Sequence, residues 1–293
     1  MQNALTIDVE EHFQVHNLES AVSRSDWDGH ESRVEANVER ILELLDRRRT
    51  KATFFVLGWV AERHPELVGH IASLGHEVAS HGYAHRLVYS QTQQEFADDL
   101  ERSTAILRDA LSRATTPPRW PLRGYRAPSF SITAAAPWAL DTIRDAGFCY
   151  DSSIMPASGH DRYGMKDVSR FAHASSNGLI ECPVSTVRCL GRNWPAAGGG
   201  YFRLFPIWFT RWAVRRINSE GHPAVVYLHP WEFDPMQPRI HGPSAWMRFR
   251  HYVNLDKTYQ RLDDLLGRFT FGPMCEVYAD LISGAGESAL PRK

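Results

Sequence analysis

The stretch Gly75-His76-Glu77-Val78-Ala79-Ser80-His81-Gly82-Tyr83-Ala84-His85 does most to define the fold of this chain of 293 residues. Its first part has the composition of a short strand, and Gly75 is typical of the residue that ends a preceding helix. His81 and His85 follow the strand directly, so a tight loop can place both rings on one side. Such a pair can bind a metal ion, but in a chain with 14 histidines it can also arise by chance, so further ligands are needed.

Strands and helices alternate on both sides of this stretch. Buried strands are expected at 4–9, 52–57, 76–80, 123–128, 148–150, 181–187 and 224–228. Helices are expected at 34–48, 59–74, 95–111, 133–146, 206–220 and 254–268. The alternation predicts parallel βαβ units and, at this length, a distorted (β/α) barrel. An open doubly wound sheet is the alternative, but its Gly-rich phosphate loop is missing from the sequence.

Composition limits the possible partners. The formal net charge is -1 and the basic residues are scattered, so no nucleic acid is expected. No apolar run is long enough for a transmembrane segment, and the N-terminus lacks the pattern of a signal peptide. The four cysteines form no C-x-x-C pair, which indicates reduced thiols and a cytoplasmic location. Residues 207–214 are aromatic and interrupted by arginine, which favours a partly buried helix, with membrane-surface contact as the alternative.

Polar side chains stand where the expected strands end. Asp8 and Glu10 alternate along the first strand and so face the same way, whereas Glu11 faces the other way. Arg126, Asp151 and His229 follow later strands. In a parallel barrel these ends open on one face, where active sites lie. The same residues would otherwise be surface carboxylates, a surface salt bridge or a packed core histidine.

Four motifs occur in the order that is typical of one enzyme family. They are Thr6-Ile7-Asp8-Val9-Glu10, Ser80-His81-x-x-x-His85, Arg126-Ala127-Pro128 and Val226-Tyr227-Leu228-His229. Over roughly residues 4–232 the chain resembles the polysaccharide deacetylase family (NodB-type, carbohydrate esterase family 4). Gly198-Gly199-Gly200-Tyr201-Phe202-Arg203 and His229-Pro230-Trp231-Glu232 are similar to the deacetylases associated with exopolysaccharide and exosortase loci.

The resemblance implies a role for each residue. A NodB-like barrel would span 1–232, with a C-terminal extension at 233–293 packing on it. Asp8 would be the catalytic base, Arg126 the arginine that holds it, and His229 the acid. A divalent metal, zinc by expectation, would be bound by His81, His85 and Glu10. The family commonly has two adjacent aspartates in the first motif, and because this chain has Asp8-Val9-Glu10, Glu11 stays open as an alternative ligand.

Two further assignments concern the surroundings of the site. The family's late Asp-Trp motif is not recognisable, and Asp151 is expected to orient His229 in its place. Tyr163, Tyr201 and Trp231 are expected to stack on sugar rings, with loop packing as the alternative. The implied function is metal-dependent removal of N-acetyl groups from an amino sugar in a polysaccharide or its precursor. The alternatives are an amidase acting on a small cyclic imide or ureide, and a glycan-binding module without catalysis.

Overall fold

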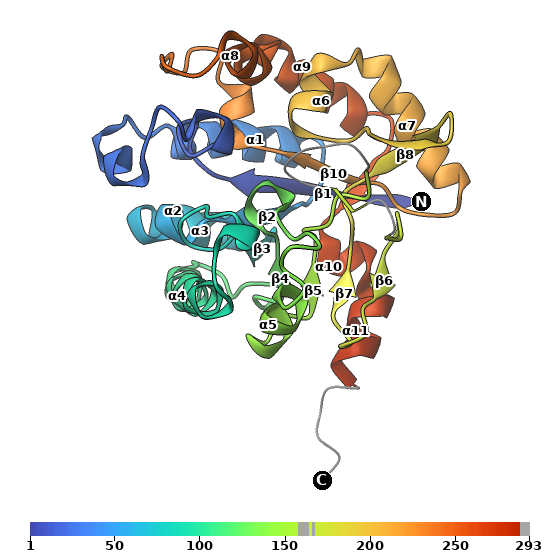
Figure 1. Cartoon of the computed structure of the whole chain (residues 1–293). Helices are drawn as coiled ribbons and strands as arrows, with labels where there is room; N and C mark the ends of the chain where they lie inside the picture. Colours follow the sequence, from blue (N-terminus) through green and yellow to red (C-terminus); the bar gives the residue numbers. More distant parts are fainter. Residues whose placement is uncertain (158–163, 166–167, 288–293) are drawn as a thin grey trace.

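The computed structural model describes residues 1–157, 164–165 and 168–287. Within these residues, one curled sheet has the strand order β10-β1-β2-β3-β4-β5-β7-β6, with β11 also paired to β1 (Figure 1). Every pairing is parallel except that of β6 with β7. The strands are β1 Gln2–Val9, β2 Thr53–Val56, β3 Glu77–Ser80, β4 Gly124–Tyr125, β5 Tyr150–Asp151, β6 His173–Ala174, β7 Ile180–Glu181, β10 Val225–Leu228 and β11 Thr270–Gly272.

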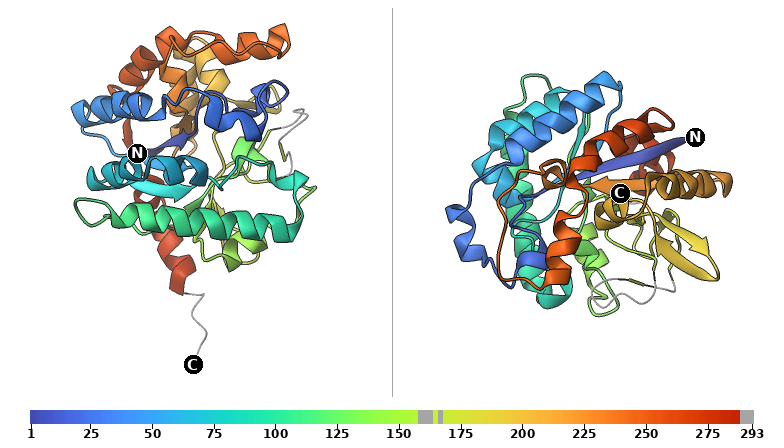
Figure 2. Two further views of the ribbon diagram at one scale, coloured as in Figure 1. Left: turned by 90° about the vertical axis from the view of Figure 1, so that its left-hand side faces the viewer. Right: turned by 90° about the horizontal axis from the view of Figure 1, so that it is seen from above.

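Helices surround the outside of the curled sheet (Figure 2). They are α1 Val34–Arg47, α2 Gly58–Arg63, α3 Pro65–Ser73, α4 Gln93–Ser112, α5 Ala139–Asp145, α6 Gly199–Leu204, α7 Ile207–Ser219, α8 Ala245–Tyr252, α9 Leu255–Leu266, α10 Met274–Val277 and α11 Ala279–Glu287. A separate hairpin pairs β8, Thr186–Cys189, with β9, Arg192–Pro195.

The central strands are buried on both faces, which explains their continuous apolar sequences. All four residues of β2 and of β10 are buried. The outer face of the sheet packs against the apolar sides of the helices; Ile7, Phe54, Ile41 and Leu262 belong to that core. The inner face has a smaller cluster, in which Phe55, Tyr150 and Tyr227 pack together. The expectation of a distorted barrel of parallel strands is confirmed as a curled, mostly parallel half-barrel.

The open side of the half-barrel is closed by irregular chain. Ser185 Oγ accepts a hydrogen bond from the Val225 amide at 2.7 Å. The Tyr227 amide donates to the Ala197 carbonyl at 3.0 Å, and Gly198 pairs with Tyr227 as an isolated parallel bridge. A Cβ atom at Gly198 would lie 2.1 Å from the ring of Tyr227, so this close approach requires glycine.

Several element boundaries differ from those expected. The helix expected at 59–74 is two helices because Pro65 starts a new one after His64. The helix expected at 133–146 begins only at Ala139. The segment after residue 232, expected to pack on the barrel, also supplies β11 to its sheet. No helix in the described part of the chain is both long and apolar enough to cross a membrane.

Candidate active site

The parallel register brings five predicted site residues to one end of the sheet. Asp8 lies in β1 and Glu10 just beyond it, and His81, Arg126 and His229 directly follow β3, β4 and β10. Because the carboxyl ends of parallel strands share one edge, these side chains converge there. Four of them are almost entirely buried, with Asp8, Glu10 and His81 each 2% exposed, and the side chain of His229 is 16% exposed.

Glu10, His81 and His85 form a potential metal site. One ligand atom from each lies within 4.8 Å of the others. His81 Nδ1 is 2.7 Å from the carbonyl oxygen of Arg126, and because a carbonyl only accepts, Nδ1 carries the hydrogen and Nε2 is left with a lone pair. Glu10 Oε2 lies 2.8 Å from His85 Nε2, so the carboxylate and this imidazole face each other directly. Two imidazoles and one carboxylate are a donor set that suits a divalent transition metal.

The surroundings of this site favour the protonation states in which Glu10 and His81 can bind a metal ion. Burial alone raises the pKa of Glu10, but the neighbouring His85, with His229 and His81, outweighs it and lowers the pKa to about 2. Burial lowers the pKa of His81 to about 4, although Asp8 and Glu10 act in the opposite direction. Near neutral pH, Glu10 is therefore ionised and His81 is neutral, which is what a metal requires of both.

Asp8 is fixed by a completely buried arginine. Arg126 Nη1 donates to Asp8 Oδ1 at 2.7 Å and to Thr6 Oγ1 at 2.6 Å. The other guanidinium nitrogens donate to the carbonyl and hydroxyl oxygens of Ser152, at 3.1 and 2.8 Å. Asp8 Oδ2 is left for other contacts and lies 3.9 Å from His229 Nε2. The arginine thus holds one oxygen of Asp8 and leaves the other facing the site.

His229 is held from the opposite ring nitrogen by Glu232. His229 Nδ1 lies 3.0 Å from Glu232 Oε1, across the short helix Pro230–Phe233. Arg203 Nε lies 3.6 Å from the same carboxylate oxygen. Burial by itself lowers the pKa of His229, but the hydrogen bond and charge of Glu232, with Glu10 and Asp8, raise it to about 9. A protonated His229 with Nε2 facing the site can donate a proton there.

Glu232 replaces Asp151 in the expected orienting role. Asp151 Oδ1 instead accepts a hydrogen bond from Ser153 at 2.5 Å, and the carboxyl group also bonds to that of Glu181. The expectation for Asp151 was therefore wrong: its side chain is used in a fully buried pair between β5 and β7. The spacing of Glu232, three residues after His229 in a Pro-started turn, was the signal in the sequence that went unused.

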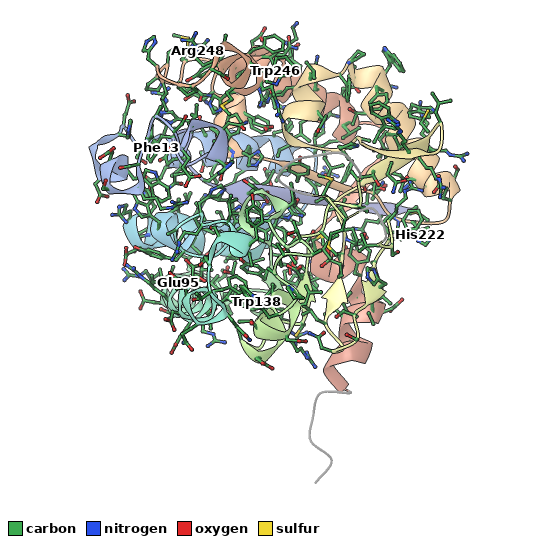
Figure 3. The ribbon with its side chains drawn as sticks, in the orientation of Figure 1. Phe13, Glu95, Trp138, His222, Trp246 and Arg248 are labelled. Atoms are coloured by element: carbon green, nitrogen blue, oxygen red, sulfur yellow. The ribbon has the colours of Figure 1, made fainter. Side chains whose placement is uncertain are left out.

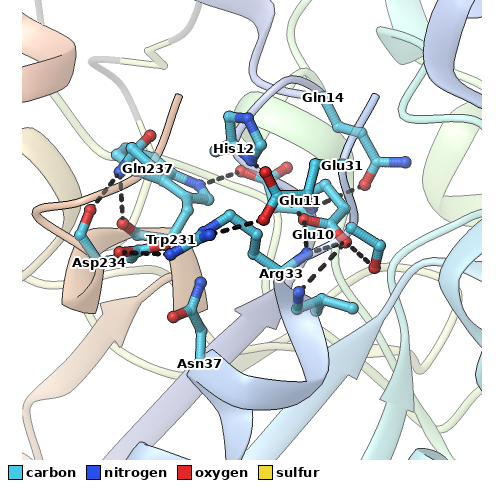
Figure 4. A network of polar contacts seen from close by, with 12 residues as sticks. Glu10, Glu11, His12, Gln14, Glu31, Arg33, Asn37, Trp231, Asp234 and Gln237 are labelled. Atoms are coloured by element: carbon cyan, nitrogen blue, oxygen red, sulfur yellow. Dashed lines mark hydrogen bonds and ion pairs between the residues drawn. The ribbon is translucent and has the colours of Figure 1, made fainter. Parts of the chain in front are cut away.

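Glu11, the alternative third ligand, is used elsewhere (Figure 4). Its carboxylate accepts hydrogen bonds from the Ser32 hydroxyl at 2.5 Å and from the backbone amides of Arg33 and Val34 at 3.0 and 3.2 Å. It therefore caps the start of α1. Arg33 continues this network and donates to Asp234 at 2.5 Å, which connects α1 to the segment that follows His229.

The aromatic residues expected to bind sugar have different positions. Tyr201 lines the same cavity as Glu10, His81 and His85. Trp231 is only 4% exposed, stacks against His229 and His251, and donates its indole N–H to Glu10 Oε1 at 3.0 Å. The indole therefore holds the Glu10 carboxylate in place, and it is too buried to stack on a sugar ring. Tyr163 lies outside the described residues.

One cavity of about 110 Å³ contains the site. Asp8, Glu10, His81, His85 and His229 line it together with residues that were not singled out in the sequence: Ser129, Phe130, Arg203, Arg250 and His251. Phe130 and Arg250 contribute a ring and a cation near the reacting groups, and Ser129 holds a left-handed backbone conformation (φ 54°).

Known proteins match the chain in two separate parts. The family model described as polysaccharide deacetylase matches residues 27–139, and one described as a domain of unknown function (DUF3473) matches residues 152–279. A peptidoglycan deacetylase of Helicobacter pylori is 30% identical over 121 residues, covering 41% of this chain and 38% of its own length. A peptidoglycan-N-acetylglucosamine deacetylase of Bacillus cereus is 29% identical over 121 residues, covering 39% of this chain and 43% of its own length.

A crystal structure from Mycobacterium smegmatis, assigned as a polysaccharide deacetylase, has the same fold. It aligns with a TM-score of 0.62 and 21% identity, over 99% of this chain and 92% of that one. The chain spans about two fifths of the length of the two curated relatives. Residues 27–139 therefore match the polysaccharide deacetylase family model, and the chain as a whole shares its fold with the Mycobacterium smegmatis structure.

Proposed function

We propose that this protein is a zinc-dependent hydrolase that removes the N-acetyl group from an amino sugar in a polysaccharide or its precursor. The observation that carries the proposal is the arrangement of a held carboxylate, Asp8, and a held, protonated imidazole, His229, around the trio Glu10, His81 and His85. A base and an acid beside a potential metal site are the groups that amide hydrolysis needs.

Zinc is proposed because the donor set contains two imidazoles and one carboxylate. Zinc accepts this combination in hydrolases and keeps a further position open for water or substrate. When bound by Glu10, His81 and His85, the ion would supply Lewis acidity toward the acetyl carbonyl. Manganese and cobalt accept similar ligands, so the preference among metals is part of the test.

The side chains of this chain divide the proton transfers between them. Asp8, fixed through Arg126, removes a proton from the water molecule that attacks the acetyl carbonyl carbon. When the C–N bond breaks, His229 gives the proton on Nε2 to the departing nitrogen. Glu232, on Nδ1, stabilises the charged imidazolium before this step. The products are a free amino sugar and acetate, and the balance is one water molecule consumed for each amide cleaved.

Acetate release across a panel of substrates tests the proposal. The panel contains N-acetylglucosamine, its oligomers, soluble peptidoglycan fragments, and small cyclic imides, each assayed with and without chelator and after zinc, manganese or cobalt is returned. The proposal predicts acetate release from at least one N-acetylated sugar, loss with chelator and recovery with zinc. Cleavage of imides alone would establish an amidase, and sugar binding without release of acetate would establish a non-catalytic module.

A further inference from the structure

The hairpin β8–β9 has an unusual tip. Its two-residue turn, Leu190-Gly191, has positive φ at both positions (50° and 75°), the pattern of a type I′ turn. Asparagine or glycine normally occupies the first of these positions, since branched side chains rarely adopt that conformation. Leu190 is nevertheless there and is 93% exposed, so neither turn geometry nor packing within this chain explains a leucine.

Charged and aromatic side chains surround this tip. Arg188 and Arg192 are exposed on either side of the turn, and among the described residues neither forms an ion pair. Trp194 follows on β9 and is 45% exposed. The hairpin thus presents a leucine, a tryptophan and two unpaired arginines outward, a combination typical of segments at the boundary between lipid headgroups and acyl chains.

The helices beside the hairpin extend the same composition. Val187 of the hairpin packs with Ala213 and Phe209 of α7, which fixes the two elements together. On α7, Trp208 is 63% exposed, and Trp212 lies one turn further along the same face. On α8, Trp246 stacks with Phe249, and Arg248 is unpaired among the described residues; Figure 3 shows Trp246 and Arg248 at the outer edge of the molecule.

Charge complementarity identifies the partner. Arg188, Arg192 and Arg248 are exposed and have no ion-pair partner among the described residues, whereas Arg203, Arg211 and Arg216 pair with Glu232, Asp264 and Glu220. Unpaired cations beside exposed leucine and tryptophan side chains complement an anionic lipid surface, which offers negative headgroups above an apolar layer. In Figure 1 the hairpin and α7 lie at the right of the view and α8 at the upper left, with α6 and α9 between them.

We infer that the face formed by the β8–β9 hairpin, α7 and α8 docks on an anionic phospholipid membrane, with Leu190 inserted below the headgroups. This face borders the active site, because Gly200, Tyr201 and Arg250 line both the catalytic cavity and a second cavity that also contains Trp246. The inference does not depend on the proposed catalysis, although docking would bring the site to substrates held at a membrane.

Flotation with lipid vesicles tests the inference. The whole chain is mixed with vesicles of phosphatidylcholine alone or of an equal mixture of phosphatidylcholine and phosphatidylglycerol, at low and high salt. We expect flotation with the mixed vesicles, little with phosphatidylcholine alone, and a decrease at high salt as the charges are screened. Failure to float with mixed vesicles at low salt would overturn the inference.

Leu190→Asn separates membrane binding from folding. Asparagine suits the left-handed position, so the melting temperature should stay the same or rise. Vesicle binding should fall about tenfold through loss of the inserted side chain. The triple change Arg188→Glu/Arg192→Glu/Arg248→Glu should reduce binding to the mixed vesicles by more than about tenfold. Arg108→Glu on the exposed side of α4 is the matched charge control and should float like the parent protein.

Other occupants of this face give other results. If it binds glycan instead, the parent protein will bind oligosaccharide and will not float with the mixed vesicles, which contradicts membrane docking. If it is an interface between two copies, the parent protein will be dimeric in light scattering without lipid and Leu190→Asn will be monomeric. Acetate release from a water-soluble substrate should be the same in all of these variants, because none of the substituted residues lines the catalytic cavity.

Discussion

At the scale of single residues, Glu232 gives His229 the protonation state that its proposed role requires. The pKa of His229 is raised to about 9, with burial opposing and Glu232 favouring the charged form. An acid catalyst works while protonated, so activity should persist below this pKa and be lost as the pH rises through it.

Glu232→Gln tests this relation. The amide keeps the size of the side chain but removes the negative charge, so the pKa of His229 should fall and the alkaline limb of the kcat profile should move to lower pH. His229→Ala should lose about 10²- to 10⁴-fold in kcat at every pH, because the acid itself is gone. Asp151→Asn is the control and should leave the alkaline limb of the profile where it is. A shift of that limb with Asp151→Asn but not with Glu232→Gln would refute the assignment of Glu232 as the partner of His229.

Single residues were predicted from the sequence where strand geometry determines them. Asp8 and Glu10 were expected on one side of β1 because side chains alternate along a strand, and both reach the site. Glu232 was given no role and Trp231 was expected to stack on sugar, because their positions depend on a short helix after β10, which turns the indole inward and the carboxylate toward His229. That turn depends on tertiary contacts with Arg203 and His251 that no local pattern reveals.

At the scale of elements, the start of α1 explains why two adjacent glutamates have different functions. Glu10 points to the potential metal site, while Glu11 binds the free amides at the N-terminus of α1. A carboxylate there interacts favourably with the helix dipole and satisfies unpaired donors. The loop after β1 is thereby attached to the helix, which positions Glu10.

The two glutamates should respond in opposite ways to the same isosteric change. Glu11→Gln should lower the free energy of unfolding by about 1 kcal/mol, as expected for a weakened helix cap, and leave zinc binding intact. Glu10→Gln should leave stability nearly unchanged and lower zinc affinity by about 10-fold or more. Denaturant titration and elemental analysis distinguish them, and zinc loss on Glu11→Gln would restore that residue as the ligand.

Long apolar elements were predicted from sequence, and short elements were not. The buried strands β2, β3 and β10 and helices α1, α4 and α7 lie within a few residues of the expected positions. The hairpin β8–β9 was missed because its turn contains Leu190 in place of the usual asparagine, and β11 because three residues give no periodicity. Packing against β1, rather than local propensity, defines β11.

At the scale of the whole molecule, the site is assembled from parts of the chain that are far apart in sequence. Asp8 and Glu10 precede both matched regions, His81, His85 and Arg126 lie in the polysaccharide deacetylase match, and His229 lies in the second match. The curled sheet brings them together because β1 pairs with both β2 and β10. A fragment ending before β10 would therefore lack the proposed acid.

Global stability should depend on pH through the buried pair of Asp151 and Glu181. Burial, with the nearby charge of Asp151, raises the pKa of Glu181 well above its usual range. A raised pKa means that the folded state holds its proton more tightly, so this contribution to stability is complete at acidic pH and decreases as the pH rises through the folded-state pKa.

Glu181→Gln should reduce this pH dependence. The amide resembles the protonated acid, so the free energy of unfolding at acidic pH should change by less than about 1 kcal/mol. Between neutral and alkaline pH the variant should lose less stability than the parent, because it has no proton to release. Denaturant titrations at several pH values provide the comparison, and parallel curves for the two proteins would contradict the assigned protonation.

The most direct test of the central claim measures acetate release and zinc content in the same samples of parent protein and Asp8→Asn. The account predicts equal zinc in both proteins, because Asp8 is not a ligand, and a turnover about 10²- to 10⁴-fold lower in the variant on the best N-acetylated sugar. Unchanged turnover in Asp8→Asn, or loss of its zinc, would contradict the account.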